Sequence, residues 1–133
     1  MAVVGASRLQ GSGVAYLATV DPEGAPRVHP VTPIVGEGHL FVFMEPTSPK
    51  GADLKRGSRF ALHSAVADMA GGGGEFVVRG AGRFIDDPVE RAVAERLAPY
   101  DAADRYVLFE LLVESAMRTD YVDGQAVRTR FPR

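Results

Sequence analysis

Residues 13–31 read GVAYLATVDPEGAPRVHPV, and this stretch decides the fold. Its first part, residues 13–20, is rich in branched and aromatic side chains, which are typical of a strand. The tetrapeptide DPEG at residues 21–24 has proline in second and glycine in fourth position, as in a type I turn. The extended run at residues 26–35 contains Pro26, Pro30 and Pro33, none of which can donate to a ladder. The sequence therefore predicts a hairpin whose second strand is an edge, bulged or partly unpaired strand.

Further elements follow on the C-terminal side of this hairpin. A turn at GEG, residues 36–38, leads into a third strand, HLFVFM, at residues 39–44. Ser48-Pro49 is a good helix start and Gly57 a good stop, while Asp87 begins a second helix that ends before Pro99. The remaining strands are predicted at residues 59–66, 75–85 and 105–114. Six or so strands and two or three short helices, without strict strand–helix alternation, predict a mainly β fold, a small antiparallel barrel.

Length and composition exclude several classes of protein. A chain of 133 residues with 46% hydrophobic and 24% charged residues is expected to form one globular domain over residues 1–133. The net charge of −2 and the scattered basic residues argue against nucleic acid as a partner. The longest run without a charged residue has twelve residues, at positions 9–20, against the roughly 18 that a membrane helix needs. The N-terminus has no signal-peptide pattern, so a cytoplasmic protein without a membrane anchor is expected.

Several kinds of catalytic and metal site are also absent from the sequence. No cysteine is present, which excludes disulfides, thiolate metal sites and cysteine nucleophiles. Neither a serine-hydrolase elbow, nor a metalloprotease motif, nor a dinucleotide-binding glycine motif occurs. We therefore expect no metal site and assign no catalytic side chain.

Lys50 is the most informative local anomaly. It falls in the first turn of the helix that Ser48 begins, where the positive end of the helix dipole disfavours a cation by about 0.3–1 kcal/mol. A bound phosphate would compensate this charge, and the Ser48 hydroxyl, the free amides and the ammonium would hold it. The alternative is a solvent-exposed lysine without a binding role.

Two other segments could contact a ligand. His29 and Arg27 project from the same face of the proline-broken strand, whose unpaired backbone groups could bind a planar heterocycle. The alternative is an ordinary edge strand. A basic, aromatic-bearing segment, Arg128 to Phe131, lies near the end of the sequence, and its alternative is a frayed end.

Three segments together resemble the pyridoxamine 5′-phosphate oxidase-like flavin-binding split-barrel family. They are the stretch quoted above, HLFVFMEPTSPKGADLKRGSRFALHS at residues 39–64, and GEFVVRGAGRFIDDP at residues 74–88. The resemblance extends from about residue 13 to residue 120. Its most specific parts are the strand, Gly-x-Pro turn and strand at residues 14–31, and Thr47-Ser48-x-Lys50 followed by Leu54 and Lys55-Arg56.

The resemblance implies a homodimer of six-stranded Greek-key split barrels with two FMN sites in the clefts between subunits. It assigns the broken strand and the end of the third strand to the isoalloxazine ring, with His29 placed as a phosphate-binding basic residue. It assigns the helix start and a following cation, Lys55 or Arg56, to the phosphate. It also implies that two further residues of the site come from the partner chain. The cofactor residues are thus Arg27, Val28, His29, Pro30, Val31, Thr32, Phe43, Met44, Ser48, Lys50, Lys55 and, from the partner, Glu75 and Phe131 of the basic tail.

The sequence also departs from the family in ways that bear on function. It has no tryptophan and ends in TRFPR, so it lacks the C-terminal groups of the vitamin-forming oxidases. We therefore expect a shortened relative, an FMN-dependent oxidoreductase that acts on an unidentified small molecule. Two alternatives are a reductase that uses an 8-hydroxy-5-deazaflavin coenzyme, and a flavin or haem carrier without catalysis.

The strand at residues 105–114 predicts the dimer independently of the resemblance. Val107, Phe109 and Leu111 lie on one face, and Leu108 and Leu112 lie on the other. A barrel of this size has a single interior to fill, so the second apolar face needs a cover. A second copy of the chain is expected to supply it.

Overall fold

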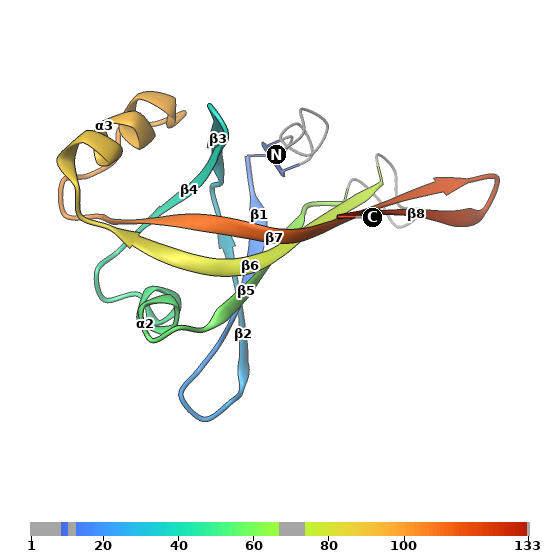
Figure 1. Cartoon of the computed structure of the whole chain (residues 1–133), viewed down its shortest axis with the longest axis horizontal. Coiled ribbons are helices and arrows are strands. Elements are labelled where there is room, and N and C mark those ends of the chain that lie inside the picture. Colours follow the sequence, from blue (N-terminus) through green and yellow to red (C-terminus); the bar gives the residue numbers. More distant parts are fainter. Residues whose placement is uncertain (1–8, 11–12, 67–73, 133) are drawn as a thin grey trace.

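The structure, a computed structural model, describes residues 9–10, 13–66 and 74–132. Strands dominate, with α2 below and α3 above the sheet in the view of Figure 1. The elements in chain order are β1 (Ala15–Val20), β2 (Pro26–Val31), β3 (Ile34–Gly36), β4 (His39–Met44), α2 (Pro49–Lys55), β5 (Arg59–Ser64), β6 (Glu75–Ile85), α3 (Pro88–Leu97), β7 (Val107–Val122) and β8 (Gln125–Phe131).

The strands form one antiparallel sheet that curls into a split barrel. Their order is β2-β1-β5-β6-β7-β4-β3, with β8 added on β7. The two ends of this path, β2 and β3, are consecutive pieces of chain that only Thr32 and Pro33 separate. The barrel is therefore closed by the chain itself, as one bent segment that pairs with β1 on one side and β4 on the other. Counted as one segment, β2 and β3 give the predicted six strands around the barrel, and the mainly β split-barrel prediction is confirmed.

The proline-bearing strand is an edge, as its sequence predicts. Pro26 and Pro30 lie opposite Val20 and Tyr16 of β1, and no other described strand pairs with β2. Pro33 falls in the break between β2 and β3. The prolines lack N–H groups, but β2 is an edge strand, so no second described strand is left without a hydrogen-bond donor.

The C-terminal part differs from the prediction. The strand expected at residues 105–114 continues as β7 to Val122, and the segment considered a basic tail forms β8, paired with β7 from Val122↔Gln125 to Ala116↔Phe131. Asp123 and Gly124 make the two-residue turn with φ angles of 52° and 77°, as a type I′ hairpin requires. The β7–β8 hairpin projects beyond the barrel in Figure 1. Among the described residues the sheet therefore has eight strands.

A bulge lies where β6 crosses β7. Arg79 is opposite Ser115 and Gly80 is opposite Val113, so Glu114 is the extra residue. The strands approach so closely that a Cβ on Gly80 would lie 1.8 Å from the carbonyl oxygen of Leu112. Only glycine fits at this position.

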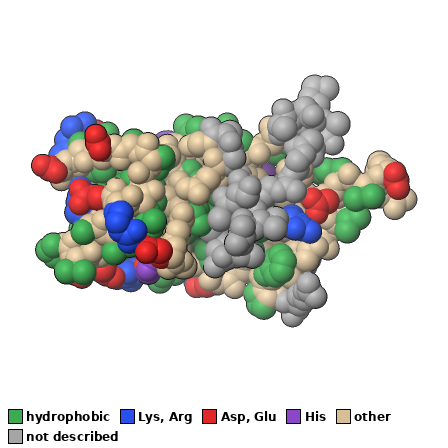
Figure 2. All heavy atoms as spheres, turned by 90° about the horizontal axis from the view of Figure 1, so that it is seen from above, with side chains coloured by type: hydrophobic (Ala, Val, Ile, Leu, Met, Phe, Trp, Pro, Cys, Tyr) green, Lys and Arg blue, Asp and Glu red, His purple; other side chains and the backbone are tan. Residues whose placement is uncertain are grey.

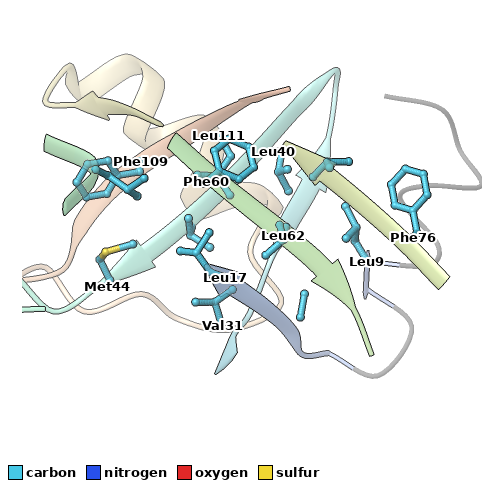
Figure 3. Close-up of a cluster of buried hydrophobic side chains, with 14 residues drawn as sticks. Leu9, Leu17, Val31, Leu40, Met44, Phe60, Leu62, Phe76, Phe109 and Leu111 are labelled. Carbon is cyan, nitrogen blue, oxygen red and sulfur yellow. The ribbon is translucent and has the colours of Figure 1, made fainter. Parts of the chain in front are cut away.

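Two apolar clusters hold the sheet. The first fills the barrel, where side chains from six strands point toward one another in Figure 3, including Leu17, Val31, Leu62 and Phe109. The second lies outside the barrel wall and packs under α3. Its members are Ile34, Phe41, Phe43, Ile85, Ala94 and Leu108.

Helices α2 and α3 begin where the sequence predicts. Ser48 is the N-cap residue of α2 with Pro49 after it, and Gly57 follows the helix with φ 103°. Asp87 caps α3, and its side chain accepts a hydrogen bond from the Val89 backbone N–H at 3.3 Å.

Candidate cofactor site

A cavity of about 420 Å³ opens where β2 gives way to β3. This volume lies within the range of small-molecule sites, about 300–1,000 Å³. The broken strand, the end of β4, α2 and the segment after α3 supply its walls. Its lining residues are Val14, Pro30, Val31, Thr32, Phe43, Met44, Glu45, Lys50, Tyr100 and Tyr106.

The apolar wall comes from β2 and β4. Phe43 and Met44 are buried, with 8% and 4% of their surfaces exposed, and end β4 beside the cavity. Pro30 has no N–H, and Thr32 lies after the last β2 residue, so the described sheet leaves backbone groups here without a ladder partner. A flat heterocycle can therefore lie against apolar side chains and hydrogen-bond to free backbone at the same time.

Lys50 is the cation of the cavity. Its ammonium donates to the Ser48 hydroxyl at 3.0 Å, and no described carboxylate pairs with it. Burial lowers the pKa of the Lys50 ammonium, because the charged form loses contact with water. Glu45 also lines the cavity, but its carboxylate is bound by Arg105 at 2.6 Å. An anionic group would therefore find an ammonium that has no carboxylate partner among the described residues.

Ser48 differs from the expected arrangement. Its backbone takes the N-cap position, but its side chain makes no capping hydrogen bond. The hydroxyl instead accepts from Lys50 and is 8% exposed as a residue. The side chain therefore positions the lysine rather than the helix end.

The residues present fit a phosphorylated planar cofactor. Apolar side chains and unpaired backbone suit a ring system, and an uncompensated, partly buried ammonium suits a phosphate. The structure thus brings together six of the predicted residues, Pro30, Val31, Thr32, Phe43, Met44 and Lys50, and joins Ser48 to them.

The sequence reasoning missed four lining residues. Val14 directly precedes β1 and Glu45 directly follows β4, so their positions beside predicted segments could have indicated that they line the site. Tyr100 and Tyr106 come from the segment between α3 and β7, and burial raises the pKa of Tyr100. Only the tertiary fold brings these two rings to the cavity.

The first half of β2 does not reach the cavity, contrary to expectation. Arg27 Nε lies 2.8 Å from the Asp53 carboxylate and belongs to an ion cluster. Val28 is 63% exposed on the opposite side of the strand, and His29, which faces the same side as Arg27, does not line the cavity either. The reason is that the bend follows Val31, so only the residues next to it face the opening.

The other predicted cations and the partner residues also lie elsewhere. Lys55 Nζ stands 4.0 Å from the centre of the Phe84 ring, and Arg56 is engaged with Asp53 and the Val20 carbonyl. Glu75 starts β6 and Phe131 ends β8, and neither lines the cavity of its own chain. Their assignment to the site of a second copy remains a prediction.

The fold and the cavity define a class, a split-barrel protein with a ligand cavity beside a proline-broken strand. The chain belongs to the pyridoxamine 5′-phosphate oxidase family, whose model matches residues 6–118. No curated protein sequence matches the chain.

Solved structures share the fold. A Clostridium acetobutylicum protein related to general stress protein 26 of B. subtilis, of the pyridoxinephosphate oxidase family, has a TM-score of 0.71 and 13% identity, covering 95% of this chain and 91% of that one. The FAD-binding protein of Mycobacterium smegmatis has a TM-score of 0.61 and 15% identity, covering 92% and 90%. A heme-binding protein of the same species has a TM-score of 0.66 and 17% identity, covering 97% of this chain but only 58% of that one.

Charged side chains of both signs are distributed over the face of the molecule in Figure 2. In the face that Figure 2 shows, basic side chains stand singly or beside acidic ones and form no stripe. Within the described ranges, no helix is both long and apolar enough to cross a membrane.

Proposed function

We propose that the protein binds FMN in this cavity and acts as an oxidoreductase on a small organic molecule. The observation that carries the proposal is that one cavity combines two features. Its wall is apolar and has backbone groups outside the sheet ladder, and it contains the Lys50 ammonium, which has no described carboxylate partner. The chain also belongs to this family. Solved structures of the same fold include an FAD-binding protein, which supports a flavin as the ligand class.

The chain's own residues would bind and orient the cofactor. When bound, the flavin supplies hydride or electron-pair chemistry at its N5 atom. Phe43 and Met44 would provide the apolar contact for the ring, and the backbone around Thr32 would hydrogen-bond to its polar edge. Lys50, held by Ser48, would neutralise the phosphate. No lining side chain is required as a general acid, so the protein's role is positioning and electrostatics.

Identification of the released cofactor tests the proposal. A yellow purified protein, FMN on mass spectrometry and turnover with an electron donor are the expected results. A colourless protein that binds only a deazaflavin would support the reductase alternative. A bound flavin or haem that never cycles would support the carrier alternative, and each of these two results contradicts the FMN oxidoreductase.

Replacing Lys50 with alanine is expected to weaken FMN binding ten- to hundredfold. The loss corresponds to one charge-assisted contact of about 1.5–3 kcal/mol. Apo stability should stay equal or rise by up to about 1 kcal/mol, because the variant removes a cation from the first turn of a helix. FMN titration and thermal melting of the apo protein measure the two effects.

Lys55→Ala is the matched control, since Lys50 and Lys55 are the chain's two lysines and share α2. The Lys55 ammonium lies over Phe84, outside the cavity, so FMN affinity should hardly change. Equal losses in both variants, or none in Lys50→Ala, would remove Lys50 from the proposed site.

The strand face from which the sequence predicts a dimer is covered in part within the chain, because Leu108 packs under α3 and only Leu112 stays exposed. We therefore propose that two copies pair through the outer face of the β1–β2 hairpin. Tyr16, Val20 and Val28 are 44%, 39% and 63% exposed there, and Pro30 of the same strand lines the cavity. Such a face of a small barrel needs an apolar cover. A partner on it would stand beside the cavity and could complete its open side.

Light scattering after size exclusion is expected to give twice the mass of one chain at micromolar concentration. Val28→Asp should produce monomers, because an isolated carboxylate would be buried between the copies. Val89→Asp on α3, where the side chain is 73% exposed, should leave the dimer intact. A wild-type monomer would contradict the pairing.

A further inference from the structure

We propose that Arg91 is a positioning residue of the cofactor cavity. Arg91 lies on α3 and is not part of the cavity lining, but it contacts two of the cavity walls. It holds in place the segment at residues 98–106, which carries Tyr100 and Tyr106. The two rings then form a wall that is already ordered when the ligand arrives. The inference rests on the proposed function in taking FMN as that ligand.

The segment needs an external anchor, because it contains no helix or strand of its own. It leaves α3 at Ala98, where the backbone becomes extended, and it reaches β7 at Val107. Within it, the Tyr106 N–H donates to the Ala103 carbonyl at 3.0 Å, which orders the last turn before β7. Carbonyl groups outside helices and ladders need another donor, from a side chain or from water.

Arg91 supplies this donor. Its guanidinium donates to the carbonyl oxygens of Tyr106 at 2.6 Å, Ala103 at 3.1 Å and Asp104 at 3.5 Å. A guanidinium has five N–H donors in a planar fork, so one side chain can bind several carbonyls in a single geometry. The Glu95 carboxylate, one turn further along α3, lies 3.8 Å from Arg91 Nε. Arg91 thus fixes the backbone that carries one ring of the wall.

The same guanidinium contacts the wall that β4 forms. Its Cζ atom lies 5.1 Å from the centre of the Phe43 ring, within the range of a cation–π contact. Phe43 is 8% exposed and lines the cavity. The Arg91 side chain is 24% exposed, so its contacts are screened less than those of an arginine in open water. One side chain therefore sets the position of the segment at residues 98–106 relative to β4.

An ordered pair of tyrosines suits a flat ligand. A tyrosine ring offers a large apolar face and loses little rotamer freedom when it is fixed. Burial and the neighbouring Tyr106 raise the pKa of Tyr100, which agrees with a phenol held against the protein. A ligand that meets groups fixed in advance does not bear the entropy cost of ordering them. Arg91 should therefore contribute to affinity through Tyr100 and Tyr106, without touching the ligand.

Arg91→Met tests the inference in the absence of any cofactor. Methionine has a similar helix propensity but offers no hydrogen-bond donor. The chain has four tyrosines and no tryptophan, so tyrosine dominates its near-ultraviolet circular dichroism. We expect Arg91→Met to lose up to about half of this signal, because two of the four rings belong to the wall. NMR of ring-labelled tyrosine should show the pKa of Tyr100 returning toward its ordinary value of 10.0.

Arg96→Met is the matched control, because Arg96 lies on the same helix and its guanidinium binds Glu37 at 2.6 Å instead. It should leave the tyrosine signal unchanged. Arg91→Lys keeps a cation near Phe43 but replaces the planar fork with one ammonium, so an intermediate signal is expected. If Arg91→Met does not fold, Arg91→Lys decides. An unchanged tyrosine signal in the Arg91 variants, or an equal change in Arg96→Met, overturns the proposal.

FMN titration measures the consequence for binding. Arg91→Met should weaken FMN about tenfold while far-ultraviolet circular dichroism shows a fully folded chain, and Arg96→Met should not weaken it. Tyr106→Ala keeps the carbonyl that Arg91 binds but removes the ring. In the Tyr106→Ala background, Arg91→Met should therefore cost less affinity than it does in the wild type. Additive losses would show that Arg91 does not act through the tyrosine wall and would refute the positioning role.

These measurements separate the inference from the proposed function. If the wild type binds no FMN, the proposed function fails, and the tyrosine signal of Arg91→Met still decides whether Arg91 orders the wall. If FMN binds equally well to the wild type and to Arg91→Met, the proposed function stands and the positioning role fails.

Discussion

Replacing Gly80 with alanine is expected to lower the free energy of unfolding by about 3 kcal/mol or more, and the melting temperature by about 10 °C or more. A Cβ at this position would lie 1.8 Å from the Leu112 carbonyl oxygen and 2.9 Å from its carbon. Both atoms belong to the backbone, so β6 and β7 would have to separate at the bulge. Denaturant unfolding followed by circular dichroism measures the loss.

Gly82→Ala provides the control on the same strand and face. Its Cβ would meet side-chain atoms of Leu54 at 3.0 Å, and a leucine side chain can shift. A loss of about 1 kcal/mol is expected, at the low end of overpacking costs. Comparable losses in the two variants would contradict the importance of the backbone contact at the bulge.

Asp53→Asn is expected to cost about 3 kcal/mol at neutral pH. The Asp53 carboxylate is 1% exposed and accepts hydrogen bonds from Thr19, Arg27 and Arg56, each at 2.8 Å. These contacts tie α2, which carries Lys50, to β1 and β2. Breaking a buried ion pair costs about 3–5 kcal/mol, and the partial exposure of both arginines places this case at the lower end.

The stabilisation that Asp53 provides should be lost only as the pH falls. Burial alone would raise the pKa of Asp53, but hydrogen bonds from Arg56, Thr19 and Arg27 outweigh it and hold the pKa below its ordinary value of 3.8. The contribution to stability is therefore present above pH 3.8 and is lost as pH falls through the lower, folded-state pKa. Urea titrations at several pH values should show the wild type and Asp53→Asn converging in acid.

The exposed pair of Glu37 with Arg96 supplies the comparison. Glu37→Gln removes an ion pair whose side chains are 53% and 59% exposed, so a change below about 1 kcal/mol is expected. If Asp53→Asn costs no more than Glu37→Gln, the buried cluster does not stabilise the fold.

Local chemistry accounts for the parts of the fold that the sequence predicted. The β1–β2 hairpin and its proline edge follow from the DPEG turn and from prolines that cannot join a second ladder. The α2 start follows from Ser48 and Pro49 in the same way. These features depend on a few neighbouring residues, so no knowledge of the tertiary structure is needed.

The missed β8 strand had a signal that was not used. Asp123-Gly124 follows Tyr121-Val122 and precedes Gln125-Ala126-Val127, and an Asp-Gly dipeptide between two strand-like segments is typical of a two-residue hairpin. The arginines and Phe131 of this segment instead indicate a basic, aromatic-bearing tail, with a frayed end as the alternative. Because β8 pairs with β7 outside the barrel, its polar pattern reflects a solvated hairpin rather than a frayed end.

The sequence predicted the candidate site only in part. One expected side chain pairs with another residue instead, and two lining residues come from a segment distant in sequence. Pro30 and Lys50 meet because the strand break and the helix start lie on the same side of the barrel. Arg27 was expected at the cavity, but Asp53, 26 residues away in sequence, pairs with it instead. Tyr100 and Tyr106 enter from a loop whose path depends on how α3 packs, which periodicity does not reveal.

The closure of the barrel by one bent segment also bears on aggregation. Free strand edges invite pairing with other chains, and natural sheets protect them with prolines and charges. Here the two end strands of the barrel sheet, β2 and β3, are consecutive pieces of chain. Pro26, Pro30 and Pro33 in this segment have no backbone N–H that could donate to an added strand. The outer edge of β8 carries Arg128 and Arg130, whose charges oppose the addition of another strand. The protein is thus protected against edge-to-edge polymerisation, and a change of either arginine to an apolar residue would weaken that protection.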